Sequence, residues 1–298
     1  MKENKSKAIL IIAILAVTAI IAIVCYGAIK GNKNPVATME VSYVDSDGNE
    51  QTGTIKIELD PEVAPISVAN FVNLANNGFY DGLTFHRIIS DFMIQGGDIN
   101  GNGTGSATLS KLDKSVIEGS SDDYTYSIKG EFAANGVNNS LKFGKGVIGM
   151  ARSDYSNYGL TQEGYNSASS QFFIVTTDKE STLNSLNQYY AAFGKVIEGY
   201  DIVEAIANVE VAASSDDESS ESSSEASTPV NAPIIKSVRV ETYGAKYDIP
   251  ETINFDEIQS TVTQYQNYYQ QLMSSYTTSS ESDVETEGTE EVETTTEE

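Results

Sequence analysis

Short runs of alternating apolar and polar residues, separated by turn signals, restrict the fold of this chain more than any other sequence feature. Residues 37–43 alternate, a turn cluster at 45–49 follows, and residues 54–59 alternate again, which predicts a β-hairpin. Further short β-rich runs come later in the chain, at residues 83–90, 92–97, 146–152, 171–177, 192–197 and 234–242. A fold built mainly from short β-strands is therefore expected.

Two helices are expected among these strands. In residues 65–76 the apolar side chains recur on one face, and Gly78 stands where a left-handed residue would end the helix. A second helix is expected at residues 200–207. Many short strands with two helices between them indicate a closed β-barrel that the helices cap.

The charge and the scarcity of reactive side chains exclude several classes of function. The formal net charge is −25, from 43 acidic and 18 basic residues, which argues against nucleic acid as a partner. Cys25 is the single cysteine and His86 the single histidine, so the chain cannot form an internal disulfide or a zinc site of His and Cys ligands. Carboxylate calcium sites remain open on composition alone. We predict no metal and no cofactor.

An uncharged apolar run at residues 8–29 is long enough to cross a bilayer as a helix. The basic residues of segment 1–7 favour a cytoplasmic N-terminus, with the rest of the chain outside the cytoplasm. A cleaved signal peptide and a lipoprotein signal lipidated at Cys25 are the alternatives. Val24 is a poor match to the small residue that precedes a lipidated cysteine. In all three cases the folded domain is extracytoplasmic, and we expect it at the cell membrane or secreted.

The remaining chain divides by composition. Residues 37–244 are expected to form one globular domain, with a disordered Ser- and Glu-rich insertion at 212–228. Apolar side chains recur at helical spacing in residues 254–276, which predicts an amphipathic helix. This helix could pack on its own domain or contact a partner or a second copy. Residues 277–298 are acidic and Thr-rich, which predicts a disordered tail.

Residues 85–98 read Phe-His-Arg-Ile-Ile-Ser-Asp-Phe-Met-Ile-Gln-Gly-Gly-Asp. On pattern alone this is a strand that places Phe85, Arg87 and Ile89 on one face, followed by a second short strand. The run closely resembles the signature of the cyclophilin family of peptidyl-prolyl cis–trans isomerases. Further matches to the family follow in order, at 102–105, 146–152, 169–174, 193–196 and 199–204. The resemblance covers roughly residues 37–244, and the stretch 126–132 is more like bacterial members.

The resemblance implies a fold and an activity. The fold is a closed eight-stranded antiparallel β-barrel capped by two α-helices, to which this chain would add an N-terminal transmembrane helix and a C-terminal helix. The activity is rotation about X–Pro bonds in unfolded or proline-containing polypeptides. That rotation has a barrier of about 18–20 kcal/mol and takes tens to hundreds of seconds without a catalyst. No covalent bond changes, so neither a nucleophile nor a metal is needed.

The resemblance also assigns roles to residues. Arg87 would donate to the nitrogen of the twisted amide, because an Arg side chain is always charged and its donors are oriented. Gln95 and Gln171 would orient Arg87 or bind substrate carbonyls. Phe92 would join Arg87 and Gln95 as a catalytic residue. The remaining predicted contacts are with the substrate. The proline cup would be formed by Phe92, Met93, Phe173 and Leu186, with Tyr190 on its rim, while Ala151 and Arg152 offer backbone groups and Gly103 lets the peptide approach.

The chain departs from the family pattern at three of these positions. Arg152 replaces a frequent Asn, Ser185 stands where a Trp is often found, and Tyr190 replaces a frequent His. None of them is the charge donor, so catalysis is expected to persist. We expect weak binding of cyclosporin-like ligands, because the Trp is missing. His86 is expected to point away from the pocket and to be structural.

Other chemistries fit the sequence less well. The stretch that begins at Asp98 resembles a calcium loop, but its twelfth position is Leu109 where a Glu is required. A serine hydrolase is disfavoured because the single histidine is expected to face away from the pocket. The main alternative is a cyclophilin-like binding or chaperone module that holds proline-containing segments without turnover.

Overall fold

The computed structural model describes residues 33–212 and 227–284 of the chain. Within those two ranges no helix is both long enough and apolar enough to cross a membrane. Several predicted segments fall wholly or largely outside the described residues: the N-terminus at 1–7, the anchor at 8–29, the insertion at 212–228, and the last part of the tail, 285–298.

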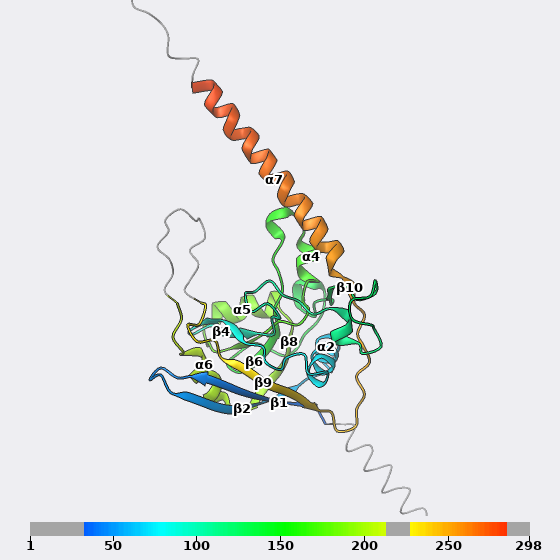
Figure 1. Cartoon of the computed structure of the whole chain (residues 1–298), viewed down its shortest axis with the longest axis vertical. Coiled ribbons are helices and arrows are strands. Elements are labelled where there is room, and N and C mark those ends of the chain that lie inside the picture. The colour runs from blue at the N-terminus through cyan, green and yellow to red at the C-terminus, as the bar shows by residue number, and fades with distance from the viewer. Residues whose placement is uncertain (1–32, 213–226, 285–298) are drawn as a thin grey trace, which may run out of the picture.

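Eight antiparallel strands form one curled sheet. Their bounds are β1 Val36–Val44, β2 Glu50–Leu59, β3 Phe85–Ile89, β4 Met93–Gly96, β6 Val147–Met150, β7 Phe172–Val175, β8 Ala192–Glu198 and β9 Ile234–Glu241. The order across the sheet is β3-β4-β7-β6-β8-β2-β1-β9 (Figure 1). Each predicted strand is present with shifted ends, and β1 and β2 form the predicted hairpin.

The sheet is open, so the prediction of a closed barrel is wrong. Strands β3 and β9 are its two edges and share no ladder. They meet at one end, where Thr84 and Ile234 form an isolated bridge. Farther along β3, the N–H of Ile88 donates to the carbonyl of Ser227, in the segment that leads into β9. Because that segment covers the edge of β3, a continuous ladder to β9 cannot form there.

An aromatic cluster fills the core enclosed by the curled sheet. Phe71, from helix α2 (Pro65–Asn76), lies 5.7 Å from the ring of Phe172 in an edge-to-face contact and 5.4 Å from the ring of Phe193. Tyr80 also packs edge-to-face on Phe172, at 5.5 Å. All four rings are fully buried. Such contacts add about 0.5–1.5 kcal/mol each beyond the burial of apolar surface, so the cluster ties α2 firmly to the sheet.

Helix α2 has the predicted bounds and is stabilised at both ends. The buried carboxylate of Glu131 accepts hydrogen bonds from the N–H groups of Ile66 and Ser67, at 2.9 and 2.8 Å. Burial raises the pKa of Glu131 above its ordinary value, although these hydrogen bonds act in the opposite direction and lower it. Gly78 follows the helix with φ +78°, and its N–H donates to Ala75. Gly78 therefore ends the helix as the sequence predicts.

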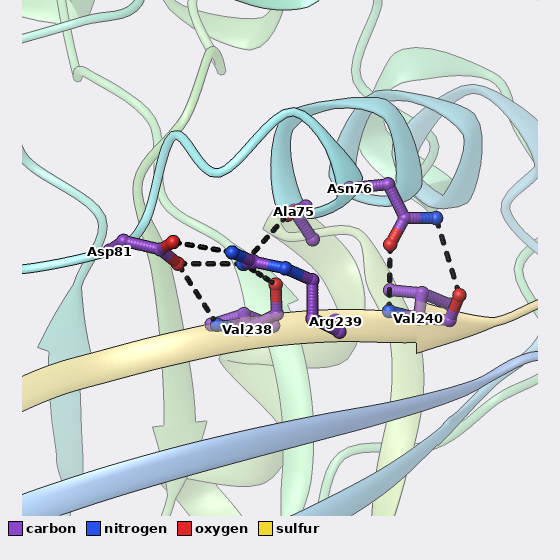
Figure 2. A network of polar contacts seen from close by, with 6 residues as sticks. All are labelled: Ala75, Asn76, Asp81, Val238, Arg239 and Val240. Carbon is purple, nitrogen blue, oxygen red and sulfur yellow. Dashed lines mark hydrogen bonds and ion pairs between the residues drawn. The ribbon is translucent and has the colours of Figure 1, made fainter.

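A polar network joins α2 to strand β9 (Figure 2). Arg239 of β9 binds Asp81 through two nitrogens, at 2.8 and 2.6 Å. The side chain of Asn76, at the end of α2, accepts from the N–H of Val240 and donates to its carbonyl. The hydrogen bonds from Arg239 lower the pKa of Asp81. These contacts fix β9 against the helix, and none of the residues that make them lines either cavity described below.

The structure contains more helix than the sequence predicts. Helix α6 (Tyr200–Ala207) is confirmed, but α5 (Glu180–Tyr189) was not predicted. Leu186 is the only fully buried residue of α5, so the apolar periodicity that reveals a helix is missing from its sequence. Short turns of helix also occur in the loops: α3 Leu109–Leu112, η1 Ala133–Asn135, η2 Ser156–Tyr158 and α4 Thr161–Tyr165.

The C-terminal helix α7 spans Phe255–Val284. It begins close to the predicted start, but residues 277–284 of the predicted tail belong to it, so the predicted end at 276 is too early. Val262 is buried, which confirms that the first turns pack on the domain. Farther on, the helix extends away from the domain (Figure 1). A contact of this part with a partner stays a prediction.

Candidate active site

Strand β3 carries Arg87 and contains a β-bulge that the sequence pattern hides. Strict alternation predicts Phe85 and Arg87 on the same face. Phe85 pairs with Gly96, whereas Arg87 pairs with Gln95, so His86 is an extra residue in β3. Consecutive residues of β4 face opposite sides of the sheet. The bulge therefore turns Phe85 into the main core and leaves Arg87 on the outer face.

A chain of side-chain hydrogen bonds holds Arg87. Its Nη1 donates to Oε1 of Gln95 at 3.3 Å, and Nε2 of Gln95 donates to Oε1 of Gln171 at 2.9 Å. Nε2 of Gln171 in turn donates to the carbonyls of Gly103 and Gly105, at 3.1 and 2.7 Å. Both amides thus have a defined orientation, and the one from Gln95 presents its oxygen to the cation. The arrangement fixes a positive charge at the surface of the sheet.

Apolar side chains surround a cavity of about 200 Å³ next to Arg87. Met93, Phe173 and Leu186 are buried, and they come from β4, β7 and α5. Phe173 stacks on Phe143 at 5.6 Å and meets Tyr190 edge-to-face at 5.5 Å. We call this cavity the apolar cup. Its lining contains the predicted site residues except Gly103 and Gln171: Arg87, Phe92, Met93, Gln95, Ala151, Arg152, Phe173, Leu186 and Tyr190.

A second cavity of about 290 Å³ adjoins the apolar cup. The two share Gln95, Ala151 and Arg152 as lining residues. Gly103 and Gln171 line the second cavity, so every predicted site residue borders one of the two. We call it the polar cavity because hydroxyl and amide side chains make up most of its wall.

The Gly-rich turn beside the polar cavity is organised by Asp98, a residue whose sequence context resembles only the start of a calcium loop. Its buried carboxylate accepts the N–H groups of Asn100 and Asn102, both at 2.9 Å, and that of Gly103. Gly103 has φ +90°, a conformation that favours glycine. The carboxylate is thus occupied by backbone donors, which explains why an Asp begins this turn.

Arg152 lies between the two cavities, and its side chain is caged by aromatic rings. The guanidinium is 5.6 Å from the ring of Phe132, 5.2 Å from that of Tyr165 and 4.9 Å from that of Tyr190. Its Nε donates to the carbonyl of Tyr189 at 2.9 Å. The family resemblance predicts only a backbone contact for Arg152. The cage also places the side chain of Arg152 at the site, as a second cation held in a fixed position.

Three smaller expectations can be compared with the geometry. The N–H of Ala151 donates to the carbonyl of Gln171, so Ala151 can offer a peptide its carbonyl but not its N–H. Ser185 is exposed on α5 and lines neither cavity. His86 is buried and also lines neither, as expected, and burial is the main cause that lowers its pKa. Within the described residues, no three His, Cys, Asp or Glu side chains are grouped so as to hold a metal ion.

Comparison with known proteins identifies the family. A family model described as "Cyclophilin type peptidyl-prolyl cis-trans isomerase/CLD" matches residues 43–240. A peptidyl-prolyl cis-trans isomerase of Acinetobacter baylyi is 40% identical over 159 residues, which are 53% of this chain and 68% of that protein. Peptidyl-prolyl cis-trans isomerase A of Dickeya dadantii is 33% identical, with the same shares of 53% and 68%.

The match to solved structures is weaker. The cyclophilin type peptidyl-prolyl cis-trans isomerase of Cryptosporidium parvum has a TM-score of 0.46 and 24% identity, and the match covers 68% of this chain and 98% of that chain. The match to the family model spans more than half of the sequence. The chain therefore belongs to the cyclophilin-type peptidyl-prolyl cis–trans isomerase family. Its enzyme class is EC 5.2.1.8, the isomerases that act on X–Pro bonds.

Proposed function

We propose that this domain accelerates X–Pro rotation in polypeptides folding outside the cytoplasm, and that Arg87 stabilises the twisted amide. The observation that carries the proposal is the placement of Arg87 at the edge of the apolar cup, with Gln95 bonded to its guanidinium. The cup offers an apolar surface to a proline ring, and both Arg87 and Arg152 line it; Arg87 is the cation that Gln95 orients. A binding site of this kind needs few polar groups, provided that they are well placed.

The mechanism follows from the electronic structure of the amide. A planar X–Pro amide shares the nitrogen lone pair with the carbonyl, whereas a twisted one returns it to the nitrogen. A donor directed at that nitrogen therefore favours the twisted form over both planar forms, and this difference is what lowers the barrier. Arg87 can donate without a change of its own charge, so the reaction needs no general base. Gln95 keeps the guanidinium oriented, and Phe92 and Met93 hold the ring beside it.

A proline-isomerisation assay on an X–Pro peptide tests the proposal. Removing a single well-placed donor to a transition state costs about 10²–10³ in rate, so Arg87→Ala should lower kcat/KM by about that factor. Arg87→Lys keeps the charge but not the planar donors, and should recover only part of the loss. Circular dichroism and thermal unfolding of each variant control for folding. If wild type and Arg87→Ala both match the uncatalysed rate, the proposal fails.

The alternative is a binding or chaperone module that holds proline-containing segments without turnover. The presence of Arg87 beside the cup favours the enzyme, because binding a neutral proline ring needs no cation there. The two functions differ in one measurement. An enzyme shortens the exchange time between cis and trans peptide at substoichiometric concentration, whereas a module only shifts the bound fraction.

We also propose that residues 8–29 anchor the protein in the cell membrane, with the isomerase domain on the outer side. The support is the length of the apolar run and the basic residues before it. Fractionation followed by protease treatment of intact cells tests the location. A Cys25→Ser variant separates the alternatives, since loss of membrane association in this variant would favour a lipid anchor. Release of a shortened chain into the medium would favour a cleaved signal.

Binding of cyclosporin-like ligands is proposed to be weak. Ser185 is exposed on α5 next to Leu186 of the apolar cup, so the wall there lacks the apolar surface that a Trp would add. Ser185→Trp should therefore strengthen the binding of such a ligand in a calorimetric titration. A tight complex with the wild-type chain would contradict this proposal.

A further inference from the structure

The polar cavity is completed by α7, a part of the chain that lies outside residues 43–240 of the family match. Phe255 and Gln259 both line it. They are one helical turn apart, so their side chains lie on the same face of the helix. Phe255 is half-buried and Gln259 is exposed, so both can meet a bound molecule. The domain and the C-terminal helix thus line the polar cavity together.

The start of α7 is attached to the domain through the backbone. Just before the helix, the two-residue strand β10 (Ile253–Asn254) pairs with β5 (Tyr126–Ser127). The N–H of Phe255 donates to the carbonyl of Thr125 at 2.8 Å. Asp256 accepts from the N–H of Thr125 at 3.3 Å. Two chain segments far apart in sequence are thereby joined next to the cavity, so Phe255 has a defined place in its wall.

Two contacts farther along the helix keep it in this position. Val262 is buried against the domain. Gln266 donates to the hydroxyl of Tyr158 at 3.4 Å, and the ring of Tyr158 lies 6.1 Å from that of Tyr269. Tyr158 belongs to η2, in the loop that follows Arg152. The helix is therefore held on both sides of the cavity wall, and Gln259 lies between the two attachments.

The chemistry of the lining points to one kind of occupant. Among the residues that the structure describes, the wall contains a single charged side chain, Arg152, and no carboxylate. The rest of its polar groups are hydroxyls and amides. This contrasts with a chain whose formal net charge is −25. A polar or acidic side chain would find donors there, whereas a lysine would meet the fixed charge of Arg152.

We propose that Phe255 and Gln259 of α7 determine substrate selectivity, by completing a pocket for a polar or acidic side chain close to the proline. The inference rests on the proposed function, because it takes the apolar cup as the place of the proline ring. The two cavities share Gln95, Ala151 and Arg152, so one short peptide can occupy both. Consecutive Cα atoms are about 3.8 Å apart, which places the selected side chain within a few residues of the proline.

The test is a positional scan with the full-length chain. Peptides carry one proline in an alanine background, and Glu, Gln, Leu or Lys replaces each of the three residues on either side in turn. We expect one position at which Glu and Gln raise kcat/KM about three- to fivefold over Lys, the size of a partly exposed charge effect. Comparison of Glu with Gln separates charge from hydrogen bonding.

Variants of α7 decide whether the helix is responsible. Gln259→Glu should reverse the preference between Glu and Lys at that position, and Phe255→Ala should reduce the selectivity to less than about twofold. Gln264→Ala is the matched control, because Gln264 is an exposed glutamine of the same helix that does not line the cavity. It should keep the wild-type selectivity. Gln259 is exposed, so its substitution should not affect folding.

The outcomes separate this inference from the proposed function. Absence of turnover on every peptide would overturn the proposed function. Turnover without positional selectivity, or selectivity that Gln259→Glu and Phe255→Ala both leave unchanged, would overturn the role of α7 and leave the isomerase intact. Reversal by Gln259→Glu together with unchanged Gln264→Ala would support the role of α7.

Discussion

The apolar cup and the polar cavity adjoin each other, yet they are built from different parts of the fold. The cup rests mainly on β3, β4 and β7, whose strand register sets the relative positions of its walls. The polar cavity shares Gln95 of β4 with the cup, but most of the rest of its wall comes from loops and from the start of α7. A sheet places side chains with little freedom, whereas loops and an added helix can change without disturbing it. The difference suggests that the reaction depends on the sheet and the selectivity on what is attached to it.

The largest effect on stability is expected from the wall of the apolar cup. Phe173 is buried and stacks on Phe143, so Phe173→Ala should cost about 3–5 kcal/mol of stability. It should also weaken the binding of every X–Pro peptide by about tenfold or more, because the apolar surface offered to the proline ring is lost. Thermal unfolding and peptide titration measure the two effects. Phe173→Leu, which keeps most of the apolar volume, should show smaller losses of both. If Phe173→Ala weakened the binding of only those peptides that carry particular residues beside the proline, the two cavities would not act separately.

Gln171 connects the two cavities, so its substitution should affect both. Gln171→Ala removes the acceptor of Gln95 and the donor to Gly103 and Gly105. Each lost neutral hydrogen bond is worth about 1 kcal/mol, so kcat/KM should fall about fivefold or more. The positional selectivity should weaken in the same variant. In Gln171→Glu the acceptor remains and the donor is lost, which should spare the orientation of Gln95 while still loosening the turn. Equal kcat/KM values for wild type, Gln171→Ala and Gln171→Glu would show that catalysis does not need the hydrogen-bonded amides of Gln95 and Gln171.

A pH titration separates stability from activity. Burial lowers the pKa of His86 below its ordinary 6.5, so the unfolded state binds a proton more readily than the folded state. The contribution of His86 to stability is therefore full above pH 6.5 and is lost as the pH falls through the folded pKa. The free energy of unfolding of wild type minus that of His86→Gln should decrease over this window. The value of kcat/KM should not follow it, since His86 lines neither cavity. A parallel fall in both quantities would place His86 in the reaction.

The smallest effect is expected from the contact between β9 and α2, which lies outside the lining of both cavities. Arg239 and Asp81 form a bidentate pair that is partly exposed, so Arg239→Ala should lower stability by about 0.5–1 kcal/mol (Figure 2). Both the rate on a standard peptide and the positional selectivity should stay at wild-type values. This variant is the baseline for the others, because it changes stability without contact with either cavity. A change in selectivity here would mean that the cavities respond to general loosening of the domain.

The sheet was predictable because its signals are local, whereas the residues of the apolar cup were predicted through the resemblance of ordered motifs to the cyclophilin family. Alternation marks strands over a few residues, and α2 shows both its apolar face and its terminating Gly78. The bulge at His86 was not predictable from one strand, because it is defined by the register with β4. The edges of the sheet were missed for a similar reason, since the segment at Ser227 covers β3.

The polar cavity was the less predictable half of the site. Its wall depends on the docking of α7, which is set by the hydrogen bond between Phe255 and Thr125 across a long stretch of sequence. Helical periodicity predicted the helix but not its contact with the site. The cage around Arg152 was also hidden, because Phe132, Tyr165 and Tyr190 come together only in the folded chain. A helix with few buried residues, such as α5, gives little signal at all.

The most direct test of the central claim compares binding and turnover of one X–Pro peptide on wild type and on Arg87→Ala. Exchange NMR gives the rate of cis–trans conversion on the protein, and titration gives the affinity for the planar forms. If Arg87 stabilises the twisted amide, the rate should fall about 10²–10³-fold while the affinity changes by less than about threefold. A rate that stays near the wild-type value, or a loss of affinity as large as the loss of rate, would contradict the account.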